Sequence, residues 1–177
     1  MIVRPFKGKA PKIATSAFIA EGAVLIGDVE IGEHASIWYG CVLRADVGHI
    51  RVGARSNVQD GSCLHMTSEL SHAVIGDDVT VGHGAIVHGA TVHDGALIGM
   101  GSILLDNAVI GSEALVAAGS LVPPRMIVPP RTMVRGQPAK VARELDEHEW
   151  LEGRRGAEHY VELAAEHAKL AAASIGK

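Results

Sequence analysis

Aliphatic residues recur at intervals of six along most of the chain, and this pattern predicts the fold. A small residue (Ala, Ser or Cys) stands four places after most of them, and glycine often follows directly. A helix would require a period of about 3.6, and sandwich strands recur every ~8–12 residues, so neither explains the pattern. The aliphatic series comprises Ile13, Ile19, Leu25, Ile31, Ile37, Leu43, Val52, Val58, Leu64, Ile75, Val81, Val87, Val92, Ile98, Leu104, Ile110, Val116 and Val122.

The period of six indicates a coil with three short strands in each turn. Each aliphatic side chain points inward and stacks on the equivalent residue of the next turn, ~4.8 Å away. The small residue lies near a corner, where a large side chain would collide with its neighbours. The sequence therefore predicts an all-β fold, a parallel β-helix of hexapeptide repeats, over residues 1–138.

The composition changes after Pro138, where Ala, Glu, Leu and Lys become frequent. We expect a C-terminal α-helical segment over residues 139–177 that packs on the β-helix, with helix from Ala139 to about Ala173. Gly153 and Gly156 are expected to divide this segment into two helices. A solenoid needs a cover on an open end or flank, and this segment can provide one.

Composition and charge exclude several classes of function for this chain. Hydrophobic residues make up 47% of the chain but aromatic residues only 3%, so the core is aliphatic. With a net charge of −4, the chain shows no basic surface of the kind that binds nucleic acid. No apolar run is long enough to span a membrane. The N-terminus lacks the apolar run of a signal peptide, and Cys41 and Cys63 do not form a disulfide framework. We expect a cytoplasmic protein.

Three of the ten histidines are placed together by the repeat. His65 follows the inward residue Leu64 and His88 follows Val87, so both point outward on the same side of the coil, one turn apart. This spacing permits a shared metal ion. His83 belongs to another side, so it either bends around the corner or serves a neighbouring subunit. A prism with three flat sides packs readily as a three-fold ring, which favours the neighbour. Five of the other seven histidines are expected to lie on the solvated surface: His34, His93, His148, His159 and His167.

Short motifs around these histidines resemble the γ-class carbonic anhydrase family over nearly the whole chain. They are Arg44-Ala45-Asp46, Asn57-Val58-Gln59-Asp60, His65 and the run from Gly82 to Gly89 that contains His83 and His88. Hexapeptide repeats alone are shared with acyltransferases, whereas this ordered set is much more specific. The resemblance implies a left-handed β-helix and a homotrimer with metal sites between subunits.

The resemblance also implies a role for each motif. His65 and His88 of one subunit and His83 of the next would hold Zn²⁺, although Fe²⁺ and Co²⁺ also accept three imidazoles. Gln59 would contact metal-bound solvent with support from Asn57 and Asp60, and Arg44 and Asp46 would form an inter-subunit ion pair. The implied reaction is hydration of CO2 to bicarbonate, in which zinc activates a water molecule, as is known from carbonic anhydrases themselves.

The chain differs from the best-known active members of the family in the residues that carry the proton of the metal-bound water away from the site. Val47 stands where one of their glutamates would be, and the short loop after His65 offers only Glu69 and His72 as proton acceptors. Alternative functions are a hexapeptide acyltransferase, a metal-assisted hydrolase of CoA thioesters, and a non-catalytic trimeric assembly module.

Overall fold

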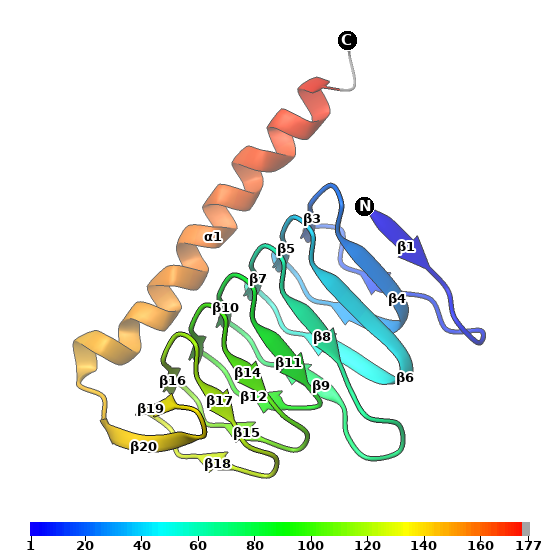
Figure 1. Ribbon diagram of the computed structural model, residues 1–177. Coiled ribbons are helices and arrows are strands. Elements are labelled where there is room, and N and C mark those ends of the chain that lie inside the picture. Colours follow the sequence, from blue (N-terminus) through cyan, green and yellow to red (C-terminus); the bar gives the residue numbers. More distant parts are fainter. Residues whose placement is uncertain (175–177) are drawn as a thin grey trace.

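The computed structural model describes the backbone of residues 1–174 and the side chains of residues 1–170. The chain forms a β-solenoid of parallel strands with one long C-terminal helix beside it (Figure 1). This confirms the predicted parallel β-helix. Three sides can be distinguished, and each is built from strands that recur once per turn.

The first side carries the two stacked histidines. Its strands align through the inward series Leu25, Leu43, Leu64, Val87 and Leu104, all fully buried. Strands β4 and β6 are long because they continue around a corner onto the second side, which joins the two sides into one sheet. The strands are β1 (Ile2–Arg4), β4 (Val24–Ile31), β6 (Val42–Val52), β8 (Cys63–His65), β11 (Ile86–His88), β14 (Ile103–Leu104) and β17 (Leu121–Val122).

The second side repeats the same stacking with Val52, Ile75, Val92 and Ile110 in line. It contains the C-terminal halves of β4 and β6. Its other strands are β2 (Lys12–Ile13), β9 (Ala73–Ile75), β12 (Thr91–Val92), β15 (Val109–Ile110) and β18 (Ile127–Val128).

The third side forms a separate sheet, in which Ile37, Val58, Val81 and Ile98 are stacked. Its strands are β3 (Phe18–Ile19), β5 (Ser36–Ile37), β7 (Asn57–Val58), β10 (Thr80–Val81), β13 (Leu97–Ile98), β16 (Leu115–Val116), β19 (Thr132–Gly136) and β20 (Ala139–Glu144). Strand β20 pairs antiparallel with β19, unlike every other pair in the two sheets.

The expected start of the helical segment at Ala139 is wrong. Residues Ala139–Glu144 form strand β20, because the edge of β19 offers backbone partners that outweigh the helix propensity of this stretch. The helix α1 begins at Glu147 and runs to Ser174. It returns along the third side from β10 towards β3 (Figure 1), so the cover lies on a flank.

The expected division of the helix at Gly153 and Gly156 is also wrong. A side chain at Gly153 would stand 2.5 Å from the carbonyl oxygen of Gly95, and one at Gly156 would stand 3.3 Å from Thr80 Oγ1. Both glycines lie inside a continuous helix and allow it to approach the corner and the third side closely. Among the described residues, no helix has the length and apolar character needed to cross a membrane.

Aromatic side chains fill the space between α1 and the third side. Trp38 is only 3% exposed, and its ring contacts Tyr160 at 5.2 Å and His167 at 5.0 Å between centroids. His167 Nδ1 also lies 2.9 Å from Tyr39 Oη. His167 is therefore half-buried between the helix and the third side rather than fully solvated as expected, and Trp38 packs under the helix of its own chain.

Candidate metal centre

His65 and His88 form the heart of the candidate site on the first side. They end strands β8 and β11 and are direct neighbours in the parallel register. Because the preceding residues Leu64 and Val87 are buried in the core, both imidazoles point outward. His65 Nδ1 lies 3.3 Å from His88 Nε2, with the two rings tilted by 56°. The predicted stacking of these two histidines on adjacent turns is confirmed.

The outer nitrogen of each ring faces a carboxylate. His65 Nε2 lies 3.0 Å from Asp46 Oδ1, and His88 Nδ1 lies 3.2 Å from Asp106 Oδ1. Arg44 Nη1 donates to the other oxygen of Asp46 at 2.5 Å. This arrangement leaves the facing nitrogens, His65 Nδ1 and His88 Nε2, directed at each other. We call Arg44, Asp46, His65, His88 and Asp106 the histidine-pair group.

Both carboxylates of this group are poised to stay ionised. Burial raises the pKa of Asp46, but hydrogen bonds with His65 and Arg44 outweigh it and hold the pKa below its ordinary value. Burial likewise raises the pKa of Asp106, and hydrogen bonds from Ser71 and Thr67 reverse the effect. An ionised carboxylate can accept a hydrogen bond from the N–H of an imidazole, and this fixes the tautomer of the ring.

Sequence reasoning missed Asp106 and its two supporting hydroxyls. Ser71 Oγ donates to Asp106 Oδ1 at 2.5 Å, and Thr67 Oγ1 donates to Asp106 Oδ2 at 3.0 Å. The hexapeptide count contains a signal for Asp106, because Leu104 stacks on Val87 and Asp106 follows two places later. Thr67 and Ser71 lie in the loop between β8 and β9, which interrupts the repeat. Counting in steps of six therefore cannot predict their position relative to the histidines.

A second group lies at the other edge of the first side, where the third side ends. His83, in the turn between β10 and β11, has its Nδ1 2.9 Å from Asp60 Oδ2. Gln59 is only 6% exposed, and its Nε2 donates to Asn57 Oδ1 at 3.1 Å. The fully buried Asn57 in turn donates to Thr80 Oγ1 at 3.0 Å. We call Asn57, Gln59, Asp60 and His83 the single-histidine group.

The structure thus gathers the eight site residues predicted from sequence into two groups on one chain. The ion pair of Arg44 with Asp46 lies within the chain. Among the described side chains of a single chain, no three His, Cys, Asp or Glu residues are arranged to hold a metal ion. The roles assigned to the eight residues stay predictions.

The geometry of the histidine pair fits a zinc ion. Two imidazole nitrogens at ~2.0–2.1 Å from a tetrahedral zinc are about 3.3 Å apart. His65 Nδ1 and His88 Nε2 have this separation, and neither carries a carboxylate partner. Imidazoles whose other nitrogen is held by a carboxylate are the ligands that zinc sites commonly use. The donor set and its spacing therefore suit zinc, with further ligands to come from outside the pair.

A pocket opens next to the histidine-pair group. Asp46, Val47 and Glu69 line it, together with Phe6 and Lys7. His72, by contrast, does not line this pocket. Of the two residues considered as proton acceptors from sequence, Glu69 is therefore the one that shares a pocket with Asp46.

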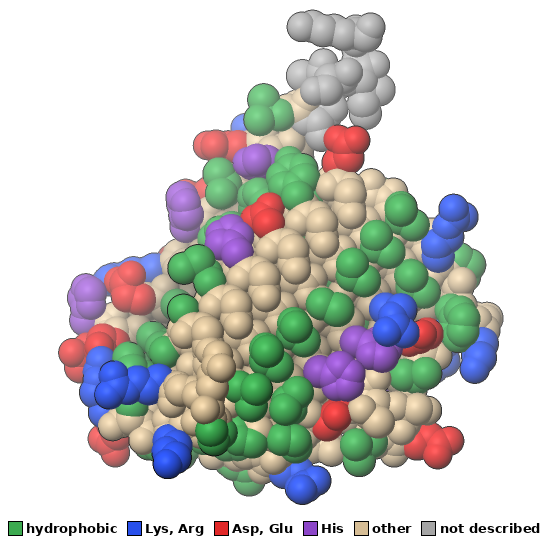
Figure 2. All heavy atoms as spheres, in the orientation of Figure 1, with side chains coloured by type: hydrophobic (Ala, Val, Ile, Leu, Met, Phe, Trp, Pro, Cys, Tyr) green, Lys and Arg blue, Asp and Glu red, His purple; other side chains and the backbone are tan. Residues whose placement is uncertain are grey.

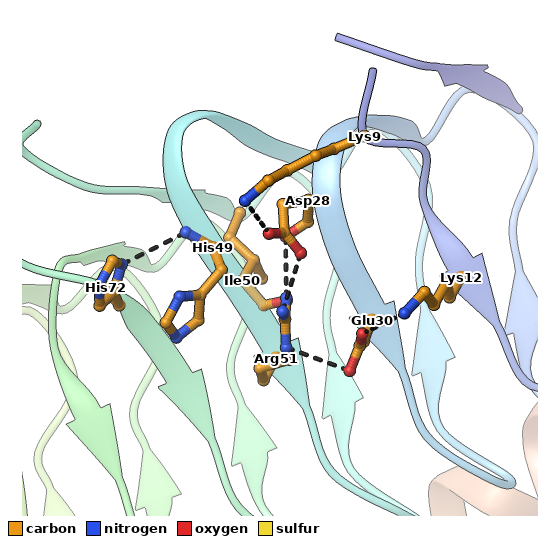
Figure 3. Close-up of polar contacts among 8 residues, drawn as sticks. All are labelled: Lys9, Lys12, Asp28, Glu30, His49, Ile50, Arg51 and His72. Carbon is orange, nitrogen blue, oxygen red and sulfur yellow. Dashed lines mark hydrogen bonds and ion pairs between the residues drawn. The ribbon is translucent and has the colours of Figure 1, made fainter. Parts of the chain in front are cut away.

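His72 is turned towards His49 on the second side (Figure 3). The two rings are stacked with centroids 3.7 Å apart, and His72 Nδ1 accepts from the backbone N–H of His49. Beside them, Arg51 bridges Asp28 and Glu30 at 2.8 and 3.1 Å. Burial lowers the pKa of His49, and the neighbouring charge of His72 adds to this shift.

Comparison with known proteins decides the family. A carbonic anhydrase from Geobacillus kaustophilus is 51% identical over 161 residues, which cover 91% of this chain and 88% of that protein. The mitochondrial gamma carbonic anhydrase 2 of Arabidopsis thaliana is 44% identical over 165 residues, and the match covers 59% of its length. This chain belongs to the γ-class carbonic anhydrase family. No family model matches the sequence.

Two similar solved structures share the β-solenoid fold of this chain but carry transferase names. A hexapeptide transferase family protein from Anaplasma phagocytophilum is 43% identical and superposes with a TM-score of 0.89 over 93% of this chain and 96% of its own. A Bacillus cereus protein with a provisional acetyltransferase assignment is 45% identical, with a TM-score of 0.93 over 96% of this chain and 98% of its own. The curated relatives confirm the sequence resemblance to the γ-class family, while the names of the solved structures keep an acyltransferase activity as the competing function.

Proposed function

We propose that this protein is a zinc enzyme that hydrates CO2 to bicarbonate, with His65 and His88 of one subunit and His83 of the next as metal ligands. The observation that carries the proposal is the histidine pair, whose facing nitrogens are separated by 3.3 Å while each outer nitrogen is held by a carboxylate. Membership of the γ-class family supports it. The free thiols of Cys41 and Cys63 agree with a reducing, cytoplasmic setting.

A homotrimer would bring the two groups of one site together. The outer surface of the first side carries a ladder of apolar side chains in register, and Figure 2 shows apolar side chains in rows across this face. The histidine-pair group and the single-histidine group flank the ladder on opposite edges. When three copies cover their ladders around one axis, each pair can meet the His83 of a neighbour. The ladder consists of Val24, Val42, Cys63, Ile86, Ile103 and Leu121.

Each part of the chain then has a defined task. A zinc ion held by His65, His88 and a neighbour's His83 would supply a water molecule activated for attack on CO2 at neutral pH, a chemistry for which carbonic anhydrases are the standard case. Asp46 and Asp106 fix the orientation of the two imidazoles. Asn57 holds the amide of Gln59 so that its oxygen can accept a hydrogen bond from solvent in the site. Glu69 can accept the proton that leaves through the adjoining pocket, which Val47 cannot.

The test combines metal analysis with CO2 hydration. Protein purified without air and without chelator should contain close to one zinc, iron or cobalt ion per subunit, and stopped-flow measurements should show hydration that a chelator abolishes. His65→Ala should lose both metal and activity. Metal-free protein with full hydration activity would contradict the proposal, as would a metal-loaded protein without any hydration.

The names of the two solved relatives favour one second candidate, an acyltransferase that uses a histidine as general base on an acyl-CoA. Such an enzyme needs no metal. Acetyl transfer from acetyl-CoA that persists in the presence of chelator would support it. A stable trimer that binds zinc but catalyses neither reaction would instead indicate an assembly module.

A further inference from the structure

Asp106 connects a metal-ligand histidine to a loop outside the repeat. Its Oδ1 lies 3.2 Å from His88 Nδ1, and its side chain is only 20% exposed. Both of its oxygens are also engaged by hydroxyl groups, Oδ1 by Ser71 and Oδ2 by Thr67. The carboxylate is therefore held from two directions while it faces the imidazole.

We infer that Asp106 positions His88 for metal binding and that the loop carrying Thr67 and Ser71 locks Asp106 in place. The inference rests on the proposed zinc site. An ionised carboxylate accepts only, so it selects the His88 tautomer with a proton on Nδ1. The lone pair of His88 then resides on Nε2, the nitrogen that faces His65. Without Asp106, the ring could rotate or take the other tautomer, and neither state presents Nε2 to the metal.

Burial and internal hydrogen bonds hold the loop in a defined position from which it can orient Asp106. Ser71 is only 5% exposed, and its Oγ also accepts from the backbone N–H of Thr67 at 3.2 Å. Gly89, directly after His88, adopts a positive φ of 66°. Any side chain there would collide with Ser71 Oγ and Asp106 Oδ1, so the glycine is what allows the hydroxyl and the carboxylate to meet beside the histidine.

The carboxylates of the two ligands are held differently. Asp46, behind His65, is paired with the guanidinium of Arg44, whereas Asp106 is held by two neutral hydroxyls. Loss of Asp106 therefore removes a negative charge next to the site without leaving a cation unpaired. For this reason, a substitution at Asp106 measures the contribution of a supporting carboxylate to metal affinity with fewer side effects than a substitution at Asp46.

The experiment compares three variants with the wild-type protein. Asp106→Ala removes the carboxylate, Asp106→Asn keeps an acceptor oxygen without charge, and Asp78→Ala is the control. Asp78 has a similarly covered side chain, 24% exposed, and pairs with Arg55 away from the histidines. Zinc affinity is measured by chelator competition, the geometry of the site by the visible spectrum of the Co²⁺-loaded protein, and folding by the melting temperature of the metal-free protein.

We expect Asp106→Ala to weaken zinc binding by about 10–100-fold and to alter the Co²⁺ spectrum, with a smaller loss for Asp106→Asn. Asp78→Ala should bind zinc like the wild type. If Asp106→Ala does not fold, Asp106→Asn and the double variant Thr67→Val, Ser71→Ala carry the test, and both should weaken zinc binding.

Three outcomes would contradict the inference, and only one of them also overturns the proposed function. A wild-type protein that binds zinc through His65, together with Asp106 variants whose affinity and Co²⁺ spectrum are unchanged, overturns the positioning role alone. A wild-type protein that binds no zinc overturns the proposed function and the inference with it. Equal weakening in Asp106→Ala and Asp78→Ala would assign the effect to general destabilisation and would also overturn the positioning role.

Discussion

At the scale of single residues, the recurring feature is a histidine whose second nitrogen faces an aspartate. His65 is paired with Asp46, His83 with Asp60 and His88 with Asp106. Imidazole has two nitrogens and can offer either one as a ligand. An aspartate on one nitrogen decides which of them stays free, so in the proposed zinc site the three pairs would present three ligand nitrogens of defined direction.

The first prediction concerns Gln59 of the single-histidine group. Gln59→Ala should keep the metal but lower CO2 hydration by about 10–100-fold, because the oriented amide is lost while all three histidines remain. Asn57→Ala should have a milder effect on the rate, since Gln59 itself remains. Because Asn57 is fully buried and donates to Thr80, this variant should also melt at a lower temperature. Unchanged hydration by metal-loaded Gln59→Ala would show that the assigned role is wrong.

The second prediction concerns the exit of the proton. Glu69 shares a pocket with Asp46 and Val47, so Glu69→Gln should lower the hydration rate by about tenfold or more at low buffer concentration, and an imidazole-type buffer should restore it. Val47→Glu should raise the rate at low buffer more than at high buffer. His72→Gln is the matched control, because His72 stacks on His49 and does not line the pocket. A wild-type rate that is already high and does not respond to buffer or to Glu69→Gln would contradict this relay.

At the scale of elements, the repeat could be predicted because every turn obeys the same packing rule. The inward positions found by counting six are buried in the structure, apart from Ile13 and Ile19 in the first turns, which are partly buried. The same count places His65 next to His88, and the structure has them paired in register. It failed where the period is interrupted, so Ser71 and Thr67 in the loop between β8 and β9 could not be assigned.

The errors after residue 138 have a different physical origin. Local propensity favours helix from Ala139, but pairing with the free edge of β19 makes this stretch a strand. Local propensity also treats Gly153 as a breaker, whereas the helix needs a residue without a side chain where it meets Gly95. Both errors arise because contacts distant in sequence decide the local structure.

The third prediction concerns the start of helix α1. Asp146 and Glu149 form a capping box, in which the backbone N–H of Glu149 donates to Asp146 Oδ1 at 2.9 Å and the backbone N–H of Asp146 donates to Glu149 Oε2 at 3.1 Å. Hydrogen bonds from Arg143 and from the backbone of Asp146 lower the pKa of Glu149 from 4.5 to about 2. Because the pKa of Glu149 is lowered in the folded state, its ionised carboxylate stabilises the helix start fully above pH 4.5. This stabilisation is lost as the pH falls towards 2.

The measurement follows the helix start by tryptophan fluorescence. Trp150 follows Glu149 directly, and the guanidinium of Arg131 lies 4.3 Å from the centre of its ring. We expect the signal to change between pH 4.5 and 2, and Glu149→Gln should show the low-pH signal already at neutral pH. Glu158→Gln, an exposed glutamate further along the helix, is the control. A transition that is identical in Glu149→Gln and the wild type would exclude Glu149 as its origin.

At the scale of the whole molecule, the three sides of the solenoid differ in what covers them. Helix α1 lies over the third side, and ion pairs of Arg51 with Asp28 and Glu30 lie on the second (Figure 3). The first side keeps its apolar ladder at the surface, where Ile86 is 39% exposed. A partner that covers this side would reach both edges at once, and the two groups of site residues lie at those edges.

The last prediction tests whether one site needs two chains. His83→Ala protein keeps the histidine pair, and His65→Ala protein keeps His83, so neither homotrimer has an intact site. After dissociation and random reassembly of equal amounts, about three quarters of the trimers contain both variants, and each of these has one intact site of its three. Zinc content and hydration should therefore return to about one quarter of the wild-type value. A mixture of His65→Ala with His88→Ala is the control, because the two nitrogens 3.3 Å apart must come from one chain and no mixed trimer can restore them. If mass spectrometry confirms mixed trimers and the first mixture still binds no zinc, then His83 does not complete the site of a neighbour.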